Sequence, residues 1–210
     1  MKCCCISDTH CNYKQLVIPD GDVLIHAGDI DAYQYSSELK DFNKWLGRLP
    51  HKYKIVIAGN HDGYISITNR DKVRKYLDNA IYLENSGCEI DGINFWGSPI
   101  TPAFLSWFFM ATRGEEIQNK YWSKISRNTD VLITHGPPYG IRDKVLFPKE
   151  ESVGCSDLLW TVKQLKPKIH IFGHIHSGYG ITKTKDTVFI NASVMDEEYD
   201  IINKPIEVTI

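Results

Sequence analysis

The sequence has 210 residues, enough to bury one hydrophobic core but too few for two ordinary domains and a linker, so we expect one domain over residues 1–210. Hydrophobic residues make up 42% and charged residues 24% of the chain, which excludes an intrinsically disordered protein. Lys and Arg number 24 against 26 Asp and Glu, and the net charge of -2 excludes a general attraction to nucleic acid, so no stable nucleic acid complex is expected.

Five short apolar runs rich in β-branched residues end at polar loops, a pattern typical of buried strands. They are Cys3 to Ser7, Val23 to Ala27, Tyr53 to Ala58, Val131 to Thr134 and Ile169 to Phe172. Helical patterns lie between some of them, one from Ser36 to Leu49 and one from Ser156 to Leu165, each closed by a nearby proline. Strands that alternate with helices in this way predict an α/β fold.

Two further segments carry the signals of β-hairpins. Asp91-Gly92 is a turn pair between residues 88 and 96, and Lys185-Asp186 separates two strand-like runs within residues 179–192. These hairpins predict mixed sheets, with antiparallel portions in the middle and near the C-terminus. Lys144 to Val153 has the charged, proline-containing composition of a mobile surface loop, and we expect it to form one edge of a cleft.

Polar residues that can bind metals come just after the predicted strands. The candidates are Asp8, His10, Asp29, Asn60, His135, His174 and His176. In open α/β sheets, ligands bind outside the carboxyl ends of the strands, so we expect these loops to converge on one crevice. Imidazole suits zinc and iron, while carboxylate and amide oxygens also accept manganese. The pattern therefore predicts a metal site with nitrogen and oxygen ligands and without thiolate.

The number of candidates favours two metal ions over one. A structural site usually needs about four ligands, and a carboxylate such as Asp29 can bridge two ions. Two ions about 3.5 to 4 Å apart acidify a bridging water and stabilise the attacking and leaving oxygens of an in-line displacement. These properties point to phosphoester hydrolysis with a bridging hydroxide as the nucleophile.

The motifs around these residues resemble a known family. Five of them match, in order, the motifs of the calcineurin-like metallophosphoesterases: Asp8-Thr9-His10, Gly28-Asp29, Gly59-Asn60-His61-Asp62, His135-Gly136 and Gly173-His174-Ile175-His176. Longer strings, such as Phe95 to Pro99 and Phe172 to Gly180, resemble the MPPED-like branch in particular. Each motif alone is weak, whereas all five in order are highly specific.

The resemblance implies a four-layer α-β-β-α sandwich, with two mixed sheets between helices, and two divalent or mixed-valence ions such as Mn, Fe or Zn. It implies that the first ion is held by Asp8, His10, Asp29 and His176, and the second by Asp29, Asn60, His135 and His174. It further implies that His61 faces the phosphoryl group as a proton donor or charge stabiliser and that Asp62 orients His61.

Other polar residues near the motifs have a simpler structural interpretation. We interpret as hydrogen-bonded structural or turn residues His26, His51, His170, Asp20, Asp22 and Asp31. The run Cys3-Cys4-Cys5 could bind metal or carry a lipid, but within a predicted central strand we favour apolar filling of the core. Cys11 departs from the small residue that the family commonly has after the first motif, and this bears on the shape of the cleft.

An aromatic-rich stretch follows the first hairpin and contains Phe95, Trp96, Phe104, Trp107, Phe108 and Phe109. These rings could stack on a nucleobase or an aryl group. Because dense aromatic residues usually pack in a core, we favour packing over stacking.

Several signals point to a soluble cytoplasmic protein. The six cysteines form no CxxC pair, which favours reduced thiols. No apolar stretch approaches the roughly 20 residues of a membrane span. The polar segment from Ser7 to His10 comes too early for a signal peptide, and Lys2 excludes N-myristoylation. We therefore expect no contact with a membrane.

The expected function is a hydrolase of small phosphodiesters such as cyclic nucleotides, and this substrate class rests on the resemblance to the branch. One alternative is a metallophosphoesterase-fold scaffold that binds a partner, which should have lost metal ligands or His61, whereas this sequence retains them. Another alternative is a protein or small-molecule phosphomonoesterase, which a broad shallow cleft would favour.

Overall fold

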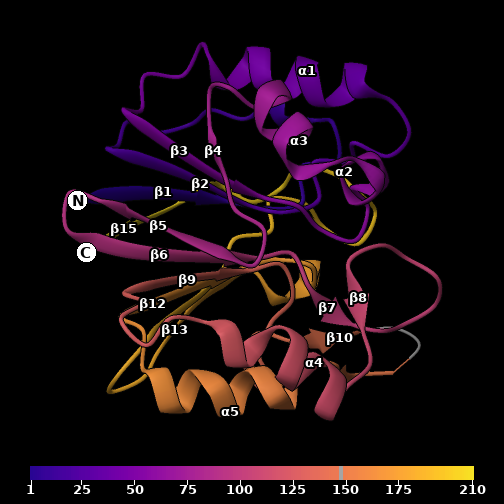
Figure 1. Cartoon of the computed structure of the whole chain (residues 1–210), viewed down its shortest axis with the longest axis vertical. Coiled ribbons are helices and arrows are strands. Elements are labelled where there is room, and N and C mark those ends of the chain that lie inside the picture. Colours follow the sequence, from indigo (N-terminus) through magenta and orange to yellow (C-terminus); the bar gives the residue numbers. More distant parts are fainter. Residues whose placement is uncertain (147–148) are drawn as a thin grey trace.

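The computed structural model describes residues 1–146 and 149–210 and contains two β-sheets packed between two layers of helices (Figure 1). The first sheet has the order β15-β1-β2-β3-β4. Its strands are β1 (Lys2–Ile6), β2 (Val23–Ala27), β3 (Tyr53–Ile57), β4 (Ile81–Tyr82) and β15 (Ile206–Thr209). Only β15 runs antiparallel to its neighbour; β1 to β4 are parallel.

The second sheet has the order β13-β14-β12-β9-β6-β5. Its strands are β5 (Ser86–Ile90), β6 (Ile93–Ser98), β9 (Val131–Thr134), β12 (Ile169–Phe172), β13 (Gly180–Lys183) and β14 (Val188–Asn191). Two short ladders flank it, made by β7 (Thr101–Pro102) with β8 (Met110–Ala111) and by β10 (Lys144–Val145) with β11 (Glu151–Ser152).

Helices cover the outer face of each sheet, which completes the predicted four-layer α-β-β-α arrangement (Figure 1). The first sheet carries the α-helices α1 (Ser36–Leu46), α2 (Gly63–Ile67) and α3 (Arg70–Tyr76) and the 3-10 helix η1 (Tyr13–Gln15). The second sheet carries α4 (Glu115–Lys120), α5 (Ser156–Leu165) and the 3-10 helix η2 (Trp122–Lys124). A third 3-10 helix, η3 (His176–Gly178), follows β12.

The central strands are buried on both faces, which explains their continuous apolar runs. Along β1, Cys3 and Cys5 point between the two sheets, whereas Cys4 points toward α1. All three side chains are fully buried, so their interpretation as core filling is confirmed. In the layer between the sheets, Cys3 and Cys5 share a cluster with aliphatic side chains of β9, β12 and β14, and this shared core holds the two sheets against each other.

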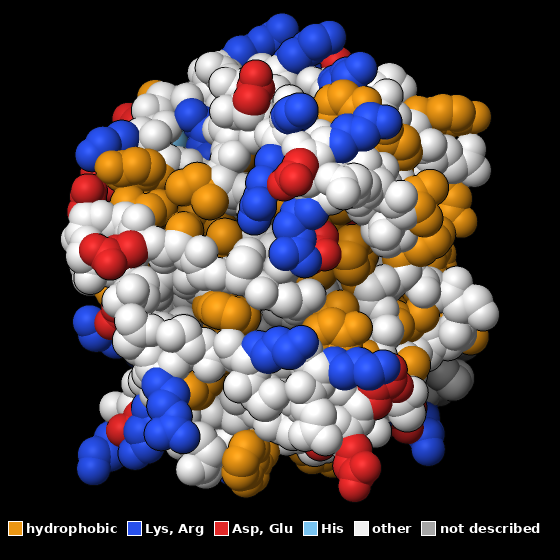
Figure 2. Space-filling view, in the orientation of Figure 1, with side chains coloured by type: hydrophobic (Ala, Val, Ile, Leu, Met, Phe, Trp, Pro, Cys, Tyr) orange, Lys and Arg blue, Asp and Glu red, His pale blue; other side chains and the backbone are white. Residues whose placement is uncertain are grey.

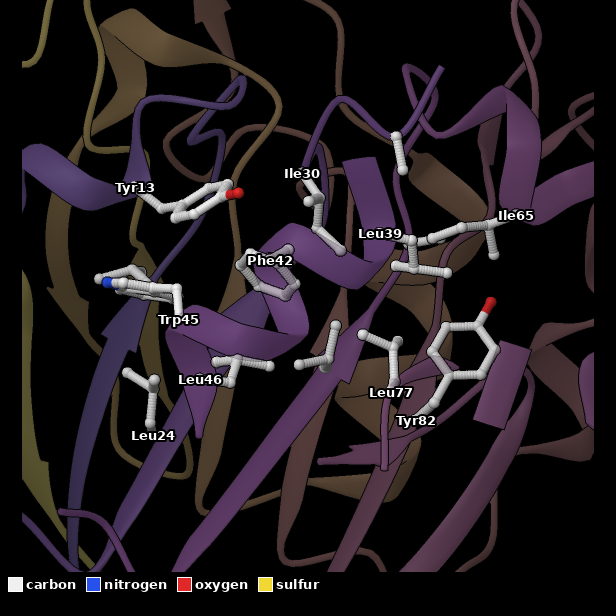
Figure 3. Packing of buried hydrophobic residues seen from close by; sticks show 14 of the residues in the cluster. Tyr13, Leu24, Ile30, Leu39, Phe42, Trp45, Leu46, Ile65, Leu77 and Tyr82 are labelled. Atoms are coloured by element: carbon white, nitrogen blue, oxygen red, sulfur yellow. The ribbon is translucent and has the colours of Figure 1, made fainter. Parts of the chain in front are cut away.

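The helix α1 shows how periodicity positions an outer layer. Leu39, Phe42, Trp45 and Leu46 recur at helical spacing and are buried against the first sheet (Figure 3). The Glu38 carboxylate accepts a hydrogen bond from the backbone N–H of Tyr35 at 3.1 Å, which satisfies a free donor at the helix start. The helix ends at Leu46, three residues before the predicted end, because the chain turns there.

Both predicted hairpins are present. At the turn between β5 and β6, Asp91 has φ 48° and Gly92 has φ 79°, the left-handed pair that a two-residue hairpin requires. The strands β13 and β14 pair antiparallel as expected. The sequence analysis did not predict β15 or the short helices α2, α3 and α4, and these helices of five to seven residues are too short to show a clear helical period.

The surface of the molecule bears on its possible partners. On the face shown in Figure 2, Lys and Arg side chains are interspersed with Asp and Glu rather than gathered in one basic patch. Within the described parts of the chain, no helix is both long enough and apolar enough to cross a membrane.

Candidate metal centre

The seven candidate ligands lie in loops that leave the carboxyl ends of strands. Asp8 and Asp29 follow β1 and β2 in the first sheet, while His135 and His174 follow β9 and β12 in the second. Because the central strands of each sheet are parallel, these ends lie at one edge of that sheet. The structure brings together all seven predicted side chains: Asp8, His10, Asp29, Asn60, His135, His174 and His176.

The first group contains Asp8, His10 and His176, whose ligand atoms lie within 4.8 Å of one another. His176 donates its Nδ1–H to the carbonyl oxygen of Asp196 at 2.7 Å, so its Nε2 lone pair is free and lies 3.8 Å from Asp8 Oδ1. His10 Nε2 is buried 3.9 Å from Asp29 Oδ2 and has no hydrogen-bond partner among the described residues. Unpartnered nitrogen beside carboxylates is an environment suited to a cation.

The second group contains Asp29, His135 and His174, again within 4.8 Å. His135 must carry its hydrogen on Nδ1, because Nδ1 faces the carbonyl oxygen of Ala27 at 2.9 Å and a carbonyl can only accept. The other nitrogen, Nε2, lies 2.9 Å from Asn60 Oδ1 and 3.2 Å from Asp29 Oδ2. Three acceptor atoms therefore converge, and either an additional proton or a metal ion must lie between them. The donor set fits a divalent cation.

The electrostatics of the metal-free centre favour a proton at this point. Burial acts to lower the pKa of His135, but the adjacent Asp29 carboxylate outweighs burial and raises this pKa to about 9. Burial in turn opposes ionisation of Asp29, yet the His135 imidazolium holds the pKa of Asp29 below its usual range. Burial lowers the pKa of His10 and lowers that of His174 to about 3, so both rings are neutral and able to bind a metal.

A pH-dependent stability follows from the pKa of His135. Because this pKa is raised above its unfolded value of 6.5 to about 9, the Asp29–His135 ion pair should stabilise the metal-free protein fully below pH 6.5. The contribution, at most about 3 kcal/mol, should be lost as pH rises through 9. Urea unfolding of chelator-treated protein between pH 6 and pH 10 measures it. The His135→Gln variant should lack this component, and identical pH profiles for the two proteins would contradict the assignment.

Several ligand residues have a strained backbone. Asp8, His10, Asp29 and His174 all have positive φ, between 36° and 69°, although none is glycine. Such conformations cost about 1–3 kcal/mol each, and hydrogen bonds between the loops maintain them. The N–H of Asp8 donates to the Gly28 carbonyl at 2.9 Å, and the N–H of His174 donates to the Asp8 carboxylate at 3.0 Å. These hydrogen bonds therefore tie the loops of the centre to one another.

Two motif glycines allow this close approach of the loops. A Cβ on Gly59 would collide with the Asp29 carboxylate, and a Cβ on Gly173 would collide with that of Asp8. His26, interpreted as structural, supports the same region. It accepts a hydrogen bond from the Gly28 N–H at 3.3 Å and pairs through Nε2 with the Thr9 hydroxyl at 2.9 Å. Its structural interpretation is confirmed.

The predicted proton donor, His61, lies beside the first group. The centroid of its ring is 4.8 Å from that of His10, and its backbone N–H donates to Asp29 Oδ1 at 2.8 Å. The ring of His61 also lies beside Asp31, whose Oδ1 is 3.9 Å from His61 Nδ1. Asp31 had been interpreted as a turn residue. Its position two residues after Asp29, the same spacing as Asp8 and His10, is the signal that could have identified it.

Asp62 differs from the role that the resemblance implies. Its carboxylate accepts hydrogen bonds from the backbone N–H groups of Gly59, Ala32 and Ile30, at 2.8, 3.0 and 3.3 Å. Burial and the nearby Asp29 charge raise its pKa to about 7, although the three backbone donors act in the opposite direction. Asp62 therefore ties together the loops after β2 and β3, rather than contacting His61 through its carboxylate.

The Asp62→Asn variant tests this tie. Asparagine has one acceptor oxygen, and its amide group would face a backbone N–H, so we expect about 1–3 kcal/mol of lost stability. Metal affinity should fall by about 10- to 100-fold, measured by titration calorimetry. Asp130→Asn is a matched control, because Asp130 accepts from the Asn94 N–H at 3.0 Å without lining the centre. Equal losses of affinity in both variants would contradict the proposed tie.

A cavity of about 440 Å³ opens over the centre. Its lining includes Asp29, Asn60, His61, His174 and His176 together with Pro102, Phe104, Trp107, Val145, Val153 and Tyr199. Val145 and Val153 confirm the segment from Lys144 to Val153 as a cleft edge, although its residues 147–148 lie outside the described chain. Phe95 is buried in the core as predicted. Phe104 and Trp107 line the cleft, so for these two rings the alternative of stacking on a substrate stays open.

Tyr199 was missed because no motif surrounds it. Its ring centroid lies 4.7 Å from that of His10 and 5.4 Å from that of His176, and contacts made only in the folded chain bring it there. Cys11 is exposed, donates its thiol hydrogen to the Asp31 carbonyl at 3.6 Å, and is not among the residues that line the cavity.

Comparisons with known proteins agree with this geometry. The family model described as Calcineurin-like phosphoesterase matches residues 1–178. Human metallophosphoesterase domain-containing protein 1 is 42% identical to the chain, over 96% of this chain and 68% of that protein. A UPF0046 protein of Caenorhabditis elegans is 39% identical, over 98% and 74%. A Thermus thermophilus structure, TT1561, shares the fold with a TM-score of 0.64 at 11% identity, over 90% and 88%. The chain therefore belongs to the calcineurin-like metallophosphoesterases, in the branch that includes metallophosphoesterase domain-containing protein 1.

Proposed function

We propose that this protein hydrolyses phosphoesters with two adjacent metal ions. One ion would be held by Asp8, His10, Asp29 and His176, and the other by Asp29, Asn60, His135 and His174. The observation that carries the proposal is the convergence of His135 Nε2, Asn60 Oδ1 and Asp29 Oδ2, three atoms that present lone pairs to one point when the His135 ring is neutral. Bound divalent ions would supply an acidified water and neutralise the charge of a phosphoryl group.

The side chains of the centre support distinct roles. Asp29 Oδ2 faces His135 at 3.2 Å and His10 at 3.9 Å, so Asp29 is the residue that both groups share. His61 lies next to His10 at the cleft wall, where its ring can donate a proton to the leaving oxygen. The backbone N–H of His61 donates to Asp29 Oδ1, and this hydrogen bond positions His61 relative to the shared carboxylate.

The proposed substrates are small phosphodiesters such as cyclic nucleotides. A cavity of about 440 Å³ is in the range of sites for small ligands. The family model is that of phosphoesterases, and the diester preference rests on the resemblance of the motifs to the branch. We also propose that residues 1–210 act as one domain, since ligands come from both sheets and the sheets share one core.

One assay separates this proposal from the alternatives. Purified protein loaded with Mn²⁺ should hydrolyse bis(p-nitrophenyl) phosphate, faster than p-nitrophenyl phosphate, and chelation should remove the activity. A preference for the monoester would favour a phosphomonoesterase. If ions bind but neither ester is hydrolysed, a scaffold that keeps the fold for partner binding becomes the better description.

A further inference from the structure

Three aromatic rings lie against three different histidines of the centre. Trp107 stacks on His61, with ring centroids 4.2 Å apart and an interplanar angle of 30°. The centroid of the Tyr199 ring lies 4.7 Å from that of His10, and the Phe104 ring lies 5.2 Å from that of His174. All three rings line the cavity. They surround the centre without supplying a metal ligand.

These rings are held in place yet remain accessible. Tyr199 has φ 66°, and the Asp196 carboxylate fixes its loop by accepting from the N–H groups of Glu198 at 3.1 Å and Asp200 at 2.9 Å. Phe104 keeps 38% and Tyr199 48% of its surface exposed, so a ligand can reach both rings. Strained backbone that displays a side chain in a cleft is typical of a functional position.

The charges around the cavity indicate what kind of group these rings accept. Among the described residues that line the cavity, Arg113 is the one Lys or Arg side chain. The terminal nitrogens of Arg113 donate to the carbonyls of Gly154 at 2.7 Å and Val153 at 2.6 Å. The guanidinium is thus already engaged in holding the cleft edge. The acidic Glu197 also lines the cavity and disfavours an additional negative charge.

We propose that Trp107, Phe104 and Tyr199 form a subsite for a planar aromatic ester group of the substrate, an aryl ring or a nucleobase, next to the phosphoryl group. The inference rests on the proposed phosphodiesterase activity, because it specifies the ester group that the same cleft accepts. Stacking supplies the attraction, and the apolar side chains Val145 and Val153 exclude water around the ring.

Three substrates with one leaving group test the subsite: the phenyl, cyclohexyl and methyl esters of p-nitrophenyl phosphate. In each, the same P–O bond to p-nitrophenolate breaks, so the group that remains on phosphorus is the difference. We expect kcat/KM to be about 10-fold or more higher for the phenyl than for the methyl ester, with the cyclohexyl ester between them. A cyclohexyl ester as good as the phenyl ester would overturn the assignment to a planar group.

Variants separate the subsite from the intrinsic reactivity of the esters. In Trp107→Ala the phenyl-to-methyl ratio of kcat/KM should fall by about 10-fold, and Tyr199→Ala and Phe104→Ala should lower it less. Because Trp107 contacts His61, Trp107→Ala can change the rate of hydrolysis of every ester. The ratio of kcat/KM for the phenyl and methyl esters is therefore the readout. Trp160→Ala is the control, since Trp160 is a 59% exposed tryptophan on α5 that does not line the cavity. An unchanged ratio in Trp107→Ala would overturn the proposal.

A binding measurement distinguishes failure of the subsite from failure of the proposed activity. Phenylphosphonate and methylphosphonate carry one phosphoryl group and no ester bond to hydrolyse. With Mn²⁺-loaded protein, phenylphosphonate should bind about 10-fold more tightly and perturb the tryptophan fluorescence of wild type but not of Trp107→Ala. Tighter binding without any ester hydrolysis would sink the proposed function and keep the subsite, whereas equal binding of the two phosphonates would sink the subsite alone.

Discussion

The Asp29→Ala variant is expected to lose nearly all hydrolysis of bis(p-nitrophenyl) phosphate. Asp29 is fully enclosed between the two ligand groups and contacts His135 at 3.2 Å, His10 at 3.9 Å and the His61 N–H at 2.8 Å. Its removal takes a ligand from both proposed ions and leaves Asp8 as the one carboxylate among the proposed ligands. The loss should therefore exceed the roughly 100-fold that removal of an outer partner of a metal ligand typically costs.

Metal content gives this experiment a second readout. Wild type should bind two Mn²⁺ ions per chain, and Asp29→Ala one or none, as counted by elemental analysis after gel filtration. Asp41→Ala is a suitable control, because Asp41 is a surface carboxylate that pairs with Lys14 at 2.6 Å, away from the centre. Full activity or unchanged metal content in Asp29→Ala would refute the shared-ligand arrangement.

The second large effect is expected for His61→Ala. If His61 gives a proton to the leaving oxygen, its loss should lower kcat by about 10²- to 10⁴-fold while both metal ions stay bound. The loss should be greatest for a poor leaving group, which needs the proton most. Comparison of methyl phenyl phosphate with methyl p-nitrophenyl phosphate measures this dependence, because phenol leaves less readily than p-nitrophenol.

Other outcomes for His61→Ala have clear meanings. An equal loss for both leaving groups would contradict the role of a proton donor and favour charge stabilisation. A loss of bound metal would instead make His61 a ligand, an arrangement for which its place beside His10 and Asp31 offers the atoms. His51→Gln is the control for removal of a histidine, since His51 bonds to the Pro19 carbonyl at 3.0 Å and does not line the cavity.

Local patterns determined the layered architecture. The runs at Val23–Ala27 and Ile169–Phe172 are strands with the predicted bounds, because each is apolar except for one histidine and is buried inside a sheet covered on both faces. The 3.6-residue period of α1 and the Asp91-Gly92 turn are likewise complete within a few neighbouring residues. The strand β15 was not predicted, since its pairing with β1 joins opposite ends of the chain.

The sequence by itself also predicted which candidate ligands the structure brings together, because each candidate lies just after a strand and parallel strands end at one edge. Only the tertiary structure decided how these residues are held. The tautomer of His135 depends on the Ala27 carbonyl, 108 residues away, and Asp62 acts on backbone amides of a different loop. Trp107 and Tyr199, which are far apart in the sequence, line the same cavity. Such contacts join residues that are distant along the chain and leave no local period, so they exist only once the two sheets have packed together.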